Sequence, residues 1–150
     1  MKLVIEETPD CTETEIRIRC GLMTPALQEL IALIRLHMFS VEGRRNGQTY
    51  HLRLEEIAYF EAVDGRTFAY TDDEVYEVGL RLQELEGELA KTSFERVSRT
   101  VVLNLGKLRS VKATANGRML GTLVNGEQVV INRSHVRAIR EKLQQGRWQQ

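Results

Sequence analysis

Two arginine-bearing corners are the stretches of this sequence best suited to binding chemistry. The first lies between Phe94 and Asn104, where Arg96, Ser98, Arg99 and Thr100 stand between two apolar runs. A guanidinium group can bond bidentately to guanine O6 and N7, and hydroxyl groups bind phosphate oxygens. A corner of this composition therefore suits a nucleic-acid groove, although an isolated stretch of this kind is also typical of exposed strand ends.

The second corner is Asn132-Arg133-Ser134, which follows an apolar run and precedes a helical pattern. Asn pairs with adenine and Arg with guanine in the major groove, while free N–H groups at a helix start hold phosphate. The positive end of a helix dipole gives no benefit to the Arg133 cation, which favours a role outside the fold. Asn132 and Ser134 are equally typical of a turn and a helix cap.

Known catalytic and metal-binding patterns are not found in the sequence. His37, His51 and His135 are scattered, and no GxSxG, HExxH or phosphate-binding glycine loop is present. Cys11 and Cys20 have neither zinc-finger nor CxxC spacing, and we expect them to be reduced thiols. We therefore expect a protein that is not an enzyme and that holds no metal or other cofactor.

The formal net charge of zero hides a strong asymmetry along the chain. Residues 1–90 hold 18 acidic and 9 basic residues, whereas residues 91–150 hold 3 acidic and 12 basic residues. Two interpretations remain open: the two halves attract each other within the fold or across a dimer, or the basic half faces a polyanion. No apolar run approaches the ~20 residues of a membrane span, so we expect a soluble, cytoplasmic protein.

The pattern of residues 1–37 predicts two short strands followed by a helix. Leu3–Glu7 and Glu15–Cys20 have strand-like patterns, and Thr24 with Pro25 marks a helix start. The helix has an apolar stripe typical of a core or dimer face, formed by Leu27, Leu30, Ile31 and Ile34. We expect a ββα accessory or dimerisation element at residues 1–37 and a second domain at residues 38–150.

Short strands and hairpin turns dominate the rest of the chain. Four Asn-Gly or Asp-Gly dipeptides predict tight turns, because these residues tolerate positive φ. The predicted strands are 39–43, 49–54, 57–63, 67–71, 75–78, 95–98, 101–104, 108–114, 118–124 and 128–132. Two helices are predicted, one over Leu80–Lys91 and a closing one capped by Ser134. The fold class is mostly β (α+β), an antiparallel sandwich or barrel-like sheet.

Three blocks, taken in order, resemble the LytTR family of DNA-binding regulators over roughly Phe39 to Leu143. They are Leu54 to Glu61, then Leu82 to Glu86 leading into the Arg99 corner and Asn104, then Val129 to Ser134. The resemblance implies an elongated, mostly β domain that inserts loops, rather than a recognition helix, into successive major grooves of double-stranded DNA.

The resemblance also assigns roles to residues. Arg99 and Arg133 match base-contacting positions, and the loop with Arg66 and Thr67 matches a third contact region. The residues we expect to touch the DNA backbone are Ser98, Thr100, Lys107, Asn132 and Ser134. Many members have His at the position of Ser98, Ser at that of Thr100 and Ser at that of Asn132, so the preferred DNA sequence is expected to differ.

The first 37 residues are too short for the receiver domain that many relatives carry, so the chain resembles the stand-alone variety. Such relatives are often encoded beside a small membrane protein that controls them. We expect a cytoplasmic transcription regulator that binds DNA as a homodimer, because one small domain makes few base contacts. The alternative is a protein-interaction module that acts with a membrane signalling partner and does not read DNA.

Overall fold

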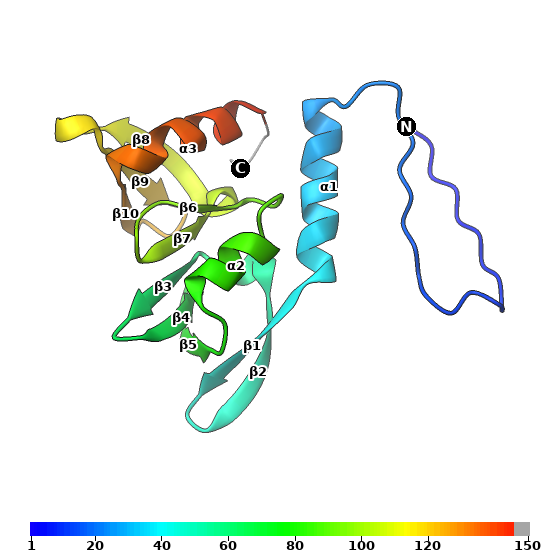
Figure 1. Ribbon diagram of the computed structural model, residues 1–150, viewed down its shortest axis with the longest axis horizontal. Helices are drawn as coiled ribbons and strands as arrows, with labels where there is room; N and C mark the ends of the chain where they lie inside the picture. Colours follow the sequence, from blue (N-terminus) through cyan, green and yellow to red (C-terminus); the bar gives the residue numbers. More distant parts are fainter. Residues whose placement is uncertain (146–150) are drawn as a thin grey trace.

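Ten strands and three α-helices make up the described part of the chain, residues 1–145 of the computed structural model (Figure 1). The helices are α1 (Pro25–Met38), α2 (Leu82–Glu88) and α3 (Arg133–Gln145). The strands are β1 (Ser40–Arg45), β2 (Gln48–Arg53), β3 (Tyr59–Val63), β4 (Arg66–Tyr70), β5 (Val75–Val78), β6 (Phe94–Arg96), β7 (Val101–Asn104), β8 (Leu108–Ala113), β9 (Met119–Leu123) and β10 (Gln128–Ile131). The ten strands predicted between residues 39 and 132 are confirmed, with ends that differ by at most two residues.

The strands form two antiparallel sheets. The larger has the order β2-β1-β5-β4-β3-β7-β6, and the smaller has the order β10-β9-β8. Two of the tight turns join their strands through two residues with positive φ, Asn46-Gly47 and Asp64-Gly65, as the twist of a hairpin requires. The predicted fold class, mostly antiparallel β with short helices, is confirmed.

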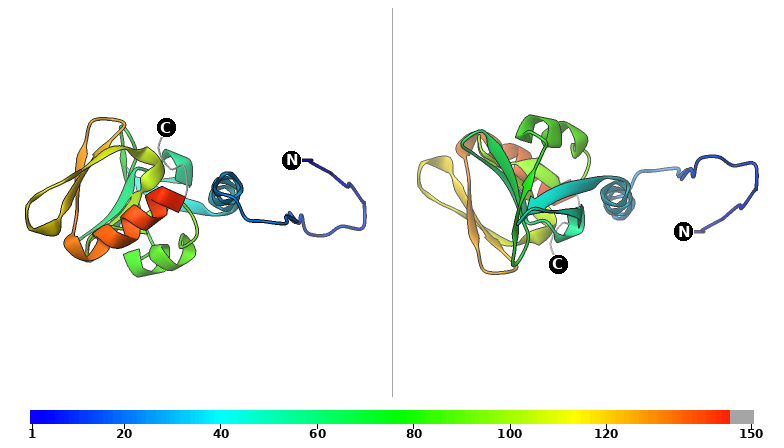
Figure 2. Two further views of the ribbon diagram at one scale, coloured as in Figure 1. Left: turned by 90° about the horizontal axis from the view of Figure 1, so that it is seen from above. Right: turned by 90° about the horizontal axis from the view of Figure 1, so that it is seen from below.

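Two hydrophobic cores hold the sheets and helices together. In the first, Leu82, Leu85 and Leu89 from the α2 region pack on Phe60 and Val102 of the large sheet. In the second, side chains from both sheets surround Ile139 of α3: Tyr59, Leu103, Leu108, Met119, Leu123 and Ile131. Figures 1 and 2 show α3 and the small sheet stacked beside the large sheet.

Asn104 anchors the end of β7 with a largely buried hydrogen-bond network. Its Oδ1 accepts from Ser93 Oγ at 2.7 Å and from the Gly106 N–H at 3.0 Å, while its Nδ2 donates to the Ile57 carbonyl at 3.0 Å. Asn104 is only 3% exposed. The asparagine that ends the central sequence block therefore has a structural role: it joins the end of β7 to the segment that precedes β6 and to the residues that precede β3.

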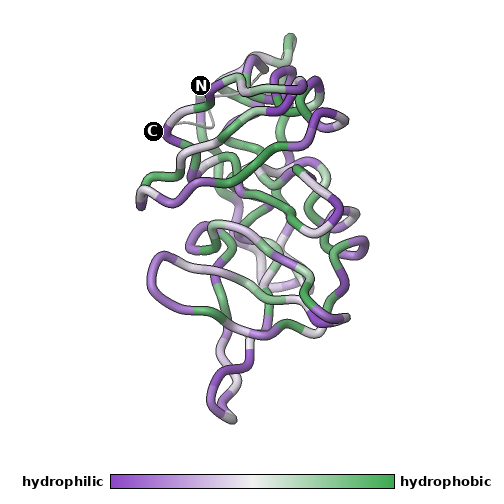
Figure 3. The backbone as a smooth tube through the Cα atoms, turned by 90° about the vertical axis from the view of Figure 1, so that its left-hand side faces the viewer, coloured by the Kyte–Doolittle hydropathy of each residue, from purple (hydrophilic) through white to green (hydrophobic). Residues whose placement is uncertain are grey.

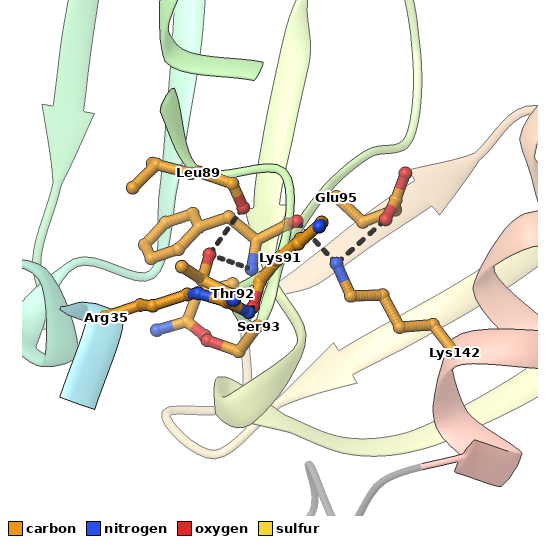
Figure 4. Close-up of polar contacts among 9 residues, drawn as sticks. Arg35, Leu89, Lys91, Thr92, Ser93, Glu95 and Lys142 are labelled. Atoms are coloured by element: carbon orange, nitrogen blue, oxygen red, sulfur yellow. Dashed lines mark hydrogen bonds and ion pairs between the residues drawn. The ribbon is translucent and has the colours of Figure 1, made fainter. Parts of the chain in front are cut away.

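Helix α1 is tied to the segment between α2 and β6, and α3 is tied to β6 itself (Figure 4). Arg35 of α1 donates to the Lys91 carbonyl at 3.3 Å. Lys142 of α3 bonds to the Phe94 carbonyl at 3.0 Å and to Glu95 Oε2 at 2.9 Å. These contacts fix both helices on the same side of the domain.

Two predictions about secondary structure are wrong: the cap of the last helix and the two N-terminal strands. Helix α3 begins at Arg133, so Ser134 lies in the first turn and is not the cap residue. The N-terminal strands Leu3–Glu7 and Glu15–Cys20 are absent, and these segments have no regular secondary structure. Their alternating pattern is present, but they have no neighbouring strand to pair with. The helix start is confirmed, since Thr24 Oγ1 accepts from the Leu27 N–H at 3.2 Å.

Candidate nucleic-acid interface

One end of the large sheet brings the predicted loops together. Strands β3 and β7 are antiparallel neighbours, so the β3–β4 turn lies beside the β6–β7 loop. The Ala62 N–H donates to the Thr100 carbonyl at 2.9 Å, which joins the two directly. We call this end, with the β3–β4, β6–β7, β8–β9 and β10–α3 connections, the loop end. It lies on the left in Figure 1 and faces the viewer in Figure 3.

Arg96 shapes the β6–β7 loop. Its guanidinium donates to the Ser98 carbonyl at 2.7 Å and to the Arg99 carbonyl, and it forms an ion pair with Glu86 at 3.3 Å. The hydroxyl of Ser98 accepts from the Thr100 N–H at 3.2 Å. Arg99 itself is exposed, and its side chain has no hydrogen bond or ion pair within residues 1–145. The two arginines of this corner therefore differ: Arg96 holds the loop, and the Arg99 side chain is free.

The second corner is docked on the first. The Asn132 N–H donates to the Val97 carbonyl at 2.9 Å, so the start of α3 lies against the β6–β7 loop. The exposed Arg133 side chain runs across Gly117 of the β8–β9 turn: a Cβ placed on Gly117 would lie 2.9 Å from Arg133 Cδ. Gly117 has φ +76°, so its conformation also favours glycine. Arg133 has no polar partner among the described residues.

The β3–β4 turn contributes one exposed arginine and one buried threonine. Arg66 is exposed at the start of β4 and, like Arg99, has no partner in the described chain. Thr67 is only 7% exposed, because its side chain faces the interior of the sheet. Of this predicted pair, Arg66 is the accessible member.

Not every predicted residue lies at the loop end. Ser98 and Thr100 share the Arg99 loop, and Asn132 and Ser134 flank Arg133. Lys107 follows β7 at the opposite end, where its carbonyl accepts from the Val124 N–H at 2.9 Å. The strand β7 therefore separates Lys107 from the other residues.

Two exposed basic residues of the loop end were missed by sequence reasoning. Lys112 on β8 and Arg118 beside the β8–β9 turn flank the Gly117 position. Neither belongs to a conspicuous motif, and only the hairpin register brings them close to the second corner. The Asn116-Gly117 turn was the available signal, because it placed the two residues on either side of one hairpin.

The three acidic residues of the basic half, residues 91–150, have partners away from the loop end. Glu95 binds Lys142, Glu141 forms an ion pair with Arg137 at 3.4 Å, and Glu127 accepts from the Tyr59 hydroxyl at 2.6 Å. Of the six ion pairs among residues 1–145, only that of Arg96 with Glu86 joins the two oppositely charged halves. Internal attraction between the halves therefore leaves the loop-end cations free.

The opposite end of the sheet holds a tyrosine pair, the buried Tyr59 and the partly buried Tyr70. The rings of Tyr59 and Tyr70 stack with centroids 4.4 Å apart. Burial and the hydrogen bond to Glu127 raise the pKa of Tyr59 well above its ordinary value, and burial with the Glu61 hydrogen bond raises the pKa of Tyr70. Both hydroxyls donate to carboxylates: Tyr59 links the large sheet to the β9–β10 connection of the small sheet, and Tyr70 bonds to Glu61 within the large sheet.

Residues 1–145 contain no cluster of three or more His, Cys, Asp or Glu side chains arranged to hold a metal ion. Within the same range, no helix has both the length and the apolar character needed to cross a bilayer. What the described structure does provide is a surface of exposed cations on rigid hairpins, the arrangement expected of a polyanion-binding domain.

Comparison with known proteins identifies the class of this domain. The LytTr DNA-binding domain model matches residues 47–144. The sensory transduction protein LytT of Enterococcus faecalis is 30% identical over 94 residues, which are 62% of this chain and 39% of LytT. An uncharacterized HTH-type transcriptional regulator of Staphylococcus aureus is 22% identical over 147 residues, 95% of this chain and 98% of that protein.

A solved LytTr DNA-binding domain from Bacillus cereus has the same fold. It superposes with a TM-score of 0.65 at 24% identity and covers 69% of this chain and 95% of that domain. The matched family region includes the three corners with Arg66, Arg99 and Arg133. The chain therefore belongs to the LytTR family, and residues 47–144 are its DNA-binding domain. The resemblance inferred from the ordered sequence blocks is confirmed.

Proposed function

We propose that this protein is a transcription regulator that binds specific double-stranded DNA sites through the loop end. The observation that carries the proposal is the convergence of three unpartnered arginines, Arg66, Arg99 and Arg133, from three connections held together by backbone hydrogen bonds. All three side chains are exposed, and the backbone hydrogen bonds between their connections hold them at the same end of the domain. The name of the Staphylococcus aureus relative, a transcriptional regulator, agrees with this function.

The three arginines read base edges in the major groove, and neighbouring groups bind phosphates. Arg99 and Arg133 each bond to a guanine, and Arg66 makes a third contact at an adjacent position. Ser98, Thr100, Asn132 and Ser134 lie beside them and fix the register through the sugar-phosphate backbone. Thr67 supports the turn from inside, and Lys107 reaches only DNA that extends past the loop end.

The protein acts as a homodimer in the cytoplasm, with one domain on each of two half-sites. A single loop end supplies few base contacts, and a symmetric pair doubles them on a repeated site. The half-sites are one or two helical turns apart, at ~10–10.5 bp per turn.

The test is selection of bound duplexes from a random pool, followed by anisotropy titration with the selected and a scrambled duplex at several salt concentrations. We expect a defined half-site, tighter binding to the selected duplex and a steep loss of affinity with salt. Equal affinity for both duplexes without salt dependence would contradict the proposal. A stable complex with another protein, together with that result, would favour the interaction-module alternative.

A further inference from the structure

The N-terminal region is the most apolar surface of the described chain. Fifteen large hydrophobic residues are exposed among residues 1–145, and eleven of them lie within residues 1–38. We call residues 1–23 the N-terminal arm. It includes Ile5, 80% exposed, and Ile16, 62% exposed. Large exposed apolar side chains gathered in one region of the chain are typical of an interaction site.

The backbone of the arm is also unpartnered. Within the described chain, its only hydrogen bond between backbone groups runs from the Cys11 N–H to the Thr8 carbonyl at 3.2 Å, in a turn, and the Cys11 thiol donates to the Glu13 carbonyl at 2.9 Å. Figures 1 and 2 show the arm extending away from the domain, with α1 between them. An extended segment with free N–H and C=O groups is a template for pairing with another strand.

We propose that residues 13–19 of two copies pair as antiparallel strands across a two-fold axis at Ile16. The proposal rests on the dimeric regulator above and specifies its interface. The sequence Glu13-Thr14-Glu15-Ile16-Arg17-Ile18-Arg19 is its own complement in this register. Residues whose numbers sum to 32 stand opposite each other, so each pair occurs twice, as a two-fold axis requires.

Charge complementarity selects this register. Glu15 stands opposite Arg17 of the second copy and Glu13 opposite Arg19, giving four opposite-charge pairs on one face. In the chain alone, Arg17 and Glu15 contact only each other, at 2.8 Å, with side chains 76% and 68% exposed. Directly opposite charges of unlike sign stabilise an antiparallel pair, and like charges destabilise it.

Neighbouring registers are less favourable. A shift of two residues in one direction places Glu15 opposite Glu15, and in the other direction places Arg17 opposite Arg17. A shift of one residue places charged positions against Thr14, Ile16 and Ile18. In the proposed register, Ile16 meets Ile16 of the second copy and Ile18 meets Thr14 on the apolar face.

Helix α1 adds a second apolar surface next to the arm. Ala32 and Leu36 are buried, and Arg35 ties this part of the helix to the domain. A separate stripe exposes Ala26, Leu30, which is 37% exposed, and Leu33, which is 48% exposed. The spacing i, i+4, i+7 places them in one stripe. Residues 13–19 and the stripe together supply ten residues a side, so we expect the dimer to belong to the smaller, weaker class of interfaces.

Charge reversal tests the pairing without DNA. We expect the full chain to sediment as a dimer at micromolar concentration. Glu15→Arg and Arg17→Glu each create two like-charge pairs, so each should weaken the dimer at least about tenfold at low salt. The double variant, or an equimolar mixture of the two single variants, should restore the dimer. A monomeric wild type, or a double variant no better than the single ones, would overturn the proposal.

Disulfide trapping tests the register. In a Cys11→Ser/Cys20→Ser background, Ile16→Cys places two thiols directly opposite each other, about 4.5–5.5 Å apart at Cβ. The matched control Ile18→Cys places them four residues apart along the strands, about 13 Å. Mild oxidation should covalently link the first variant and leave the second monomeric on a non-reducing gel. Equal linking of both would overturn the register.

Binding of a half-site duplex separates this inference from the proposed function. The charge-reversed variants leave the loop end unchanged and should bind a single half-site as the wild type does. If the wild type dimerises but no variant prefers the selected half-site, the proposed function fails and the interface stands. If the half-site is bound specifically by a chain that never dimerises, the interface fails and the proposed function stands.

Discussion

The polar side chains at the two ends of the large sheet differ in whether they have hydrogen-bond partners within the domain. At the far end, Tyr59 and Tyr70 donate to carboxylates and stack on each other, and Asn104 uses both of its polar atoms. At the loop end, Arg99 and Arg133 have no partner within the described chain. Both ends are built on the same strands, β3 and β7, so the difference does not come from the backbone.

The contrast separates groups that hold the fold from groups that are available for binding. Buried polar groups that lack a partner are costly, so those at the far end are satisfied internally. Exposed guanidiniums are solvated and cost little when unpaired. Substitutions at the far end should therefore change stability, and those at the loop end should change DNA binding.

The largest expected effect is loss of stability in Asn104→Ala. Removing the amide leaves the buried Ser93 hydroxyl, Ile57 carbonyl and Gly106 N–H without their partner. We expect the free energy of unfolding to fall by about 3 kcal/mol or more, measured by urea denaturation. The control Asn125→Ala removes an exposed side chain that accepts from the Glu127 N–H, and should cost less than about 1 kcal/mol. Equal losses would contradict the difference in burial.

At the loop end, Arg99→Ala and Arg133→Ala should each weaken binding to the selected duplex by ~1–3 kcal/mol and relax base preference at one position. Their unfolding free energies should stay within about 0.5 kcal/mol of wild type. Arg137→Ala is the matched control, since Arg137 lies one turn further along α3 and pairs with Glu141. Unchanged specificity in both corner variants, with the fold intact by circular dichroism, would refute the assignment.

Gly117→Ala combines the two kinds of effect. The new Cβ would meet Arg133 Cδ at 2.9 Å, and φ +76° strains any non-glycine residue. We expect a loss of about 1–2 kcal/mol in stability from the backbone and reduced specificity from displaced Arg133. Gly47→Ala has the same φ of +76° and no atom within 4 Å of the new Cβ, so it should lose stability alone. Equal DNA affinity in the two variants would show that Arg133 is not held by this contact.

Local patterns predicted the elements of the domain well, because alternation and Asn-Gly or Asp-Gly turns are properties of adjacent residues. The sequence could not predict that Arg96 holds the loop while Arg99 stays exposed. This difference depends on Glu86, ten residues from Arg96, and on two loop carbonyls. The location of Lys107 was missed for the same reason: only the direction of β7 places it at the far end. The N-terminal strands failed because alternation predicts a strand only where a partner exists.

The smallest expected effect concerns the tyrosine at the far end and appears at alkaline pH. The folded protein keeps Tyr59 protonated above its ordinary pKa of about 10, because of burial and the Glu127 carboxylate. The unfolded chain loses that proton first, so the contribution of Tyr59 to stability is present below pH 10 and declines as pH rises further. Tyr59→Phe should cost about 1 kcal/mol at pH 7 and show a shallower loss of stability above pH ~10 in urea titrations. A parallel pH profile in wild type and variant would show that the Tyr59 proton is not linked to folding.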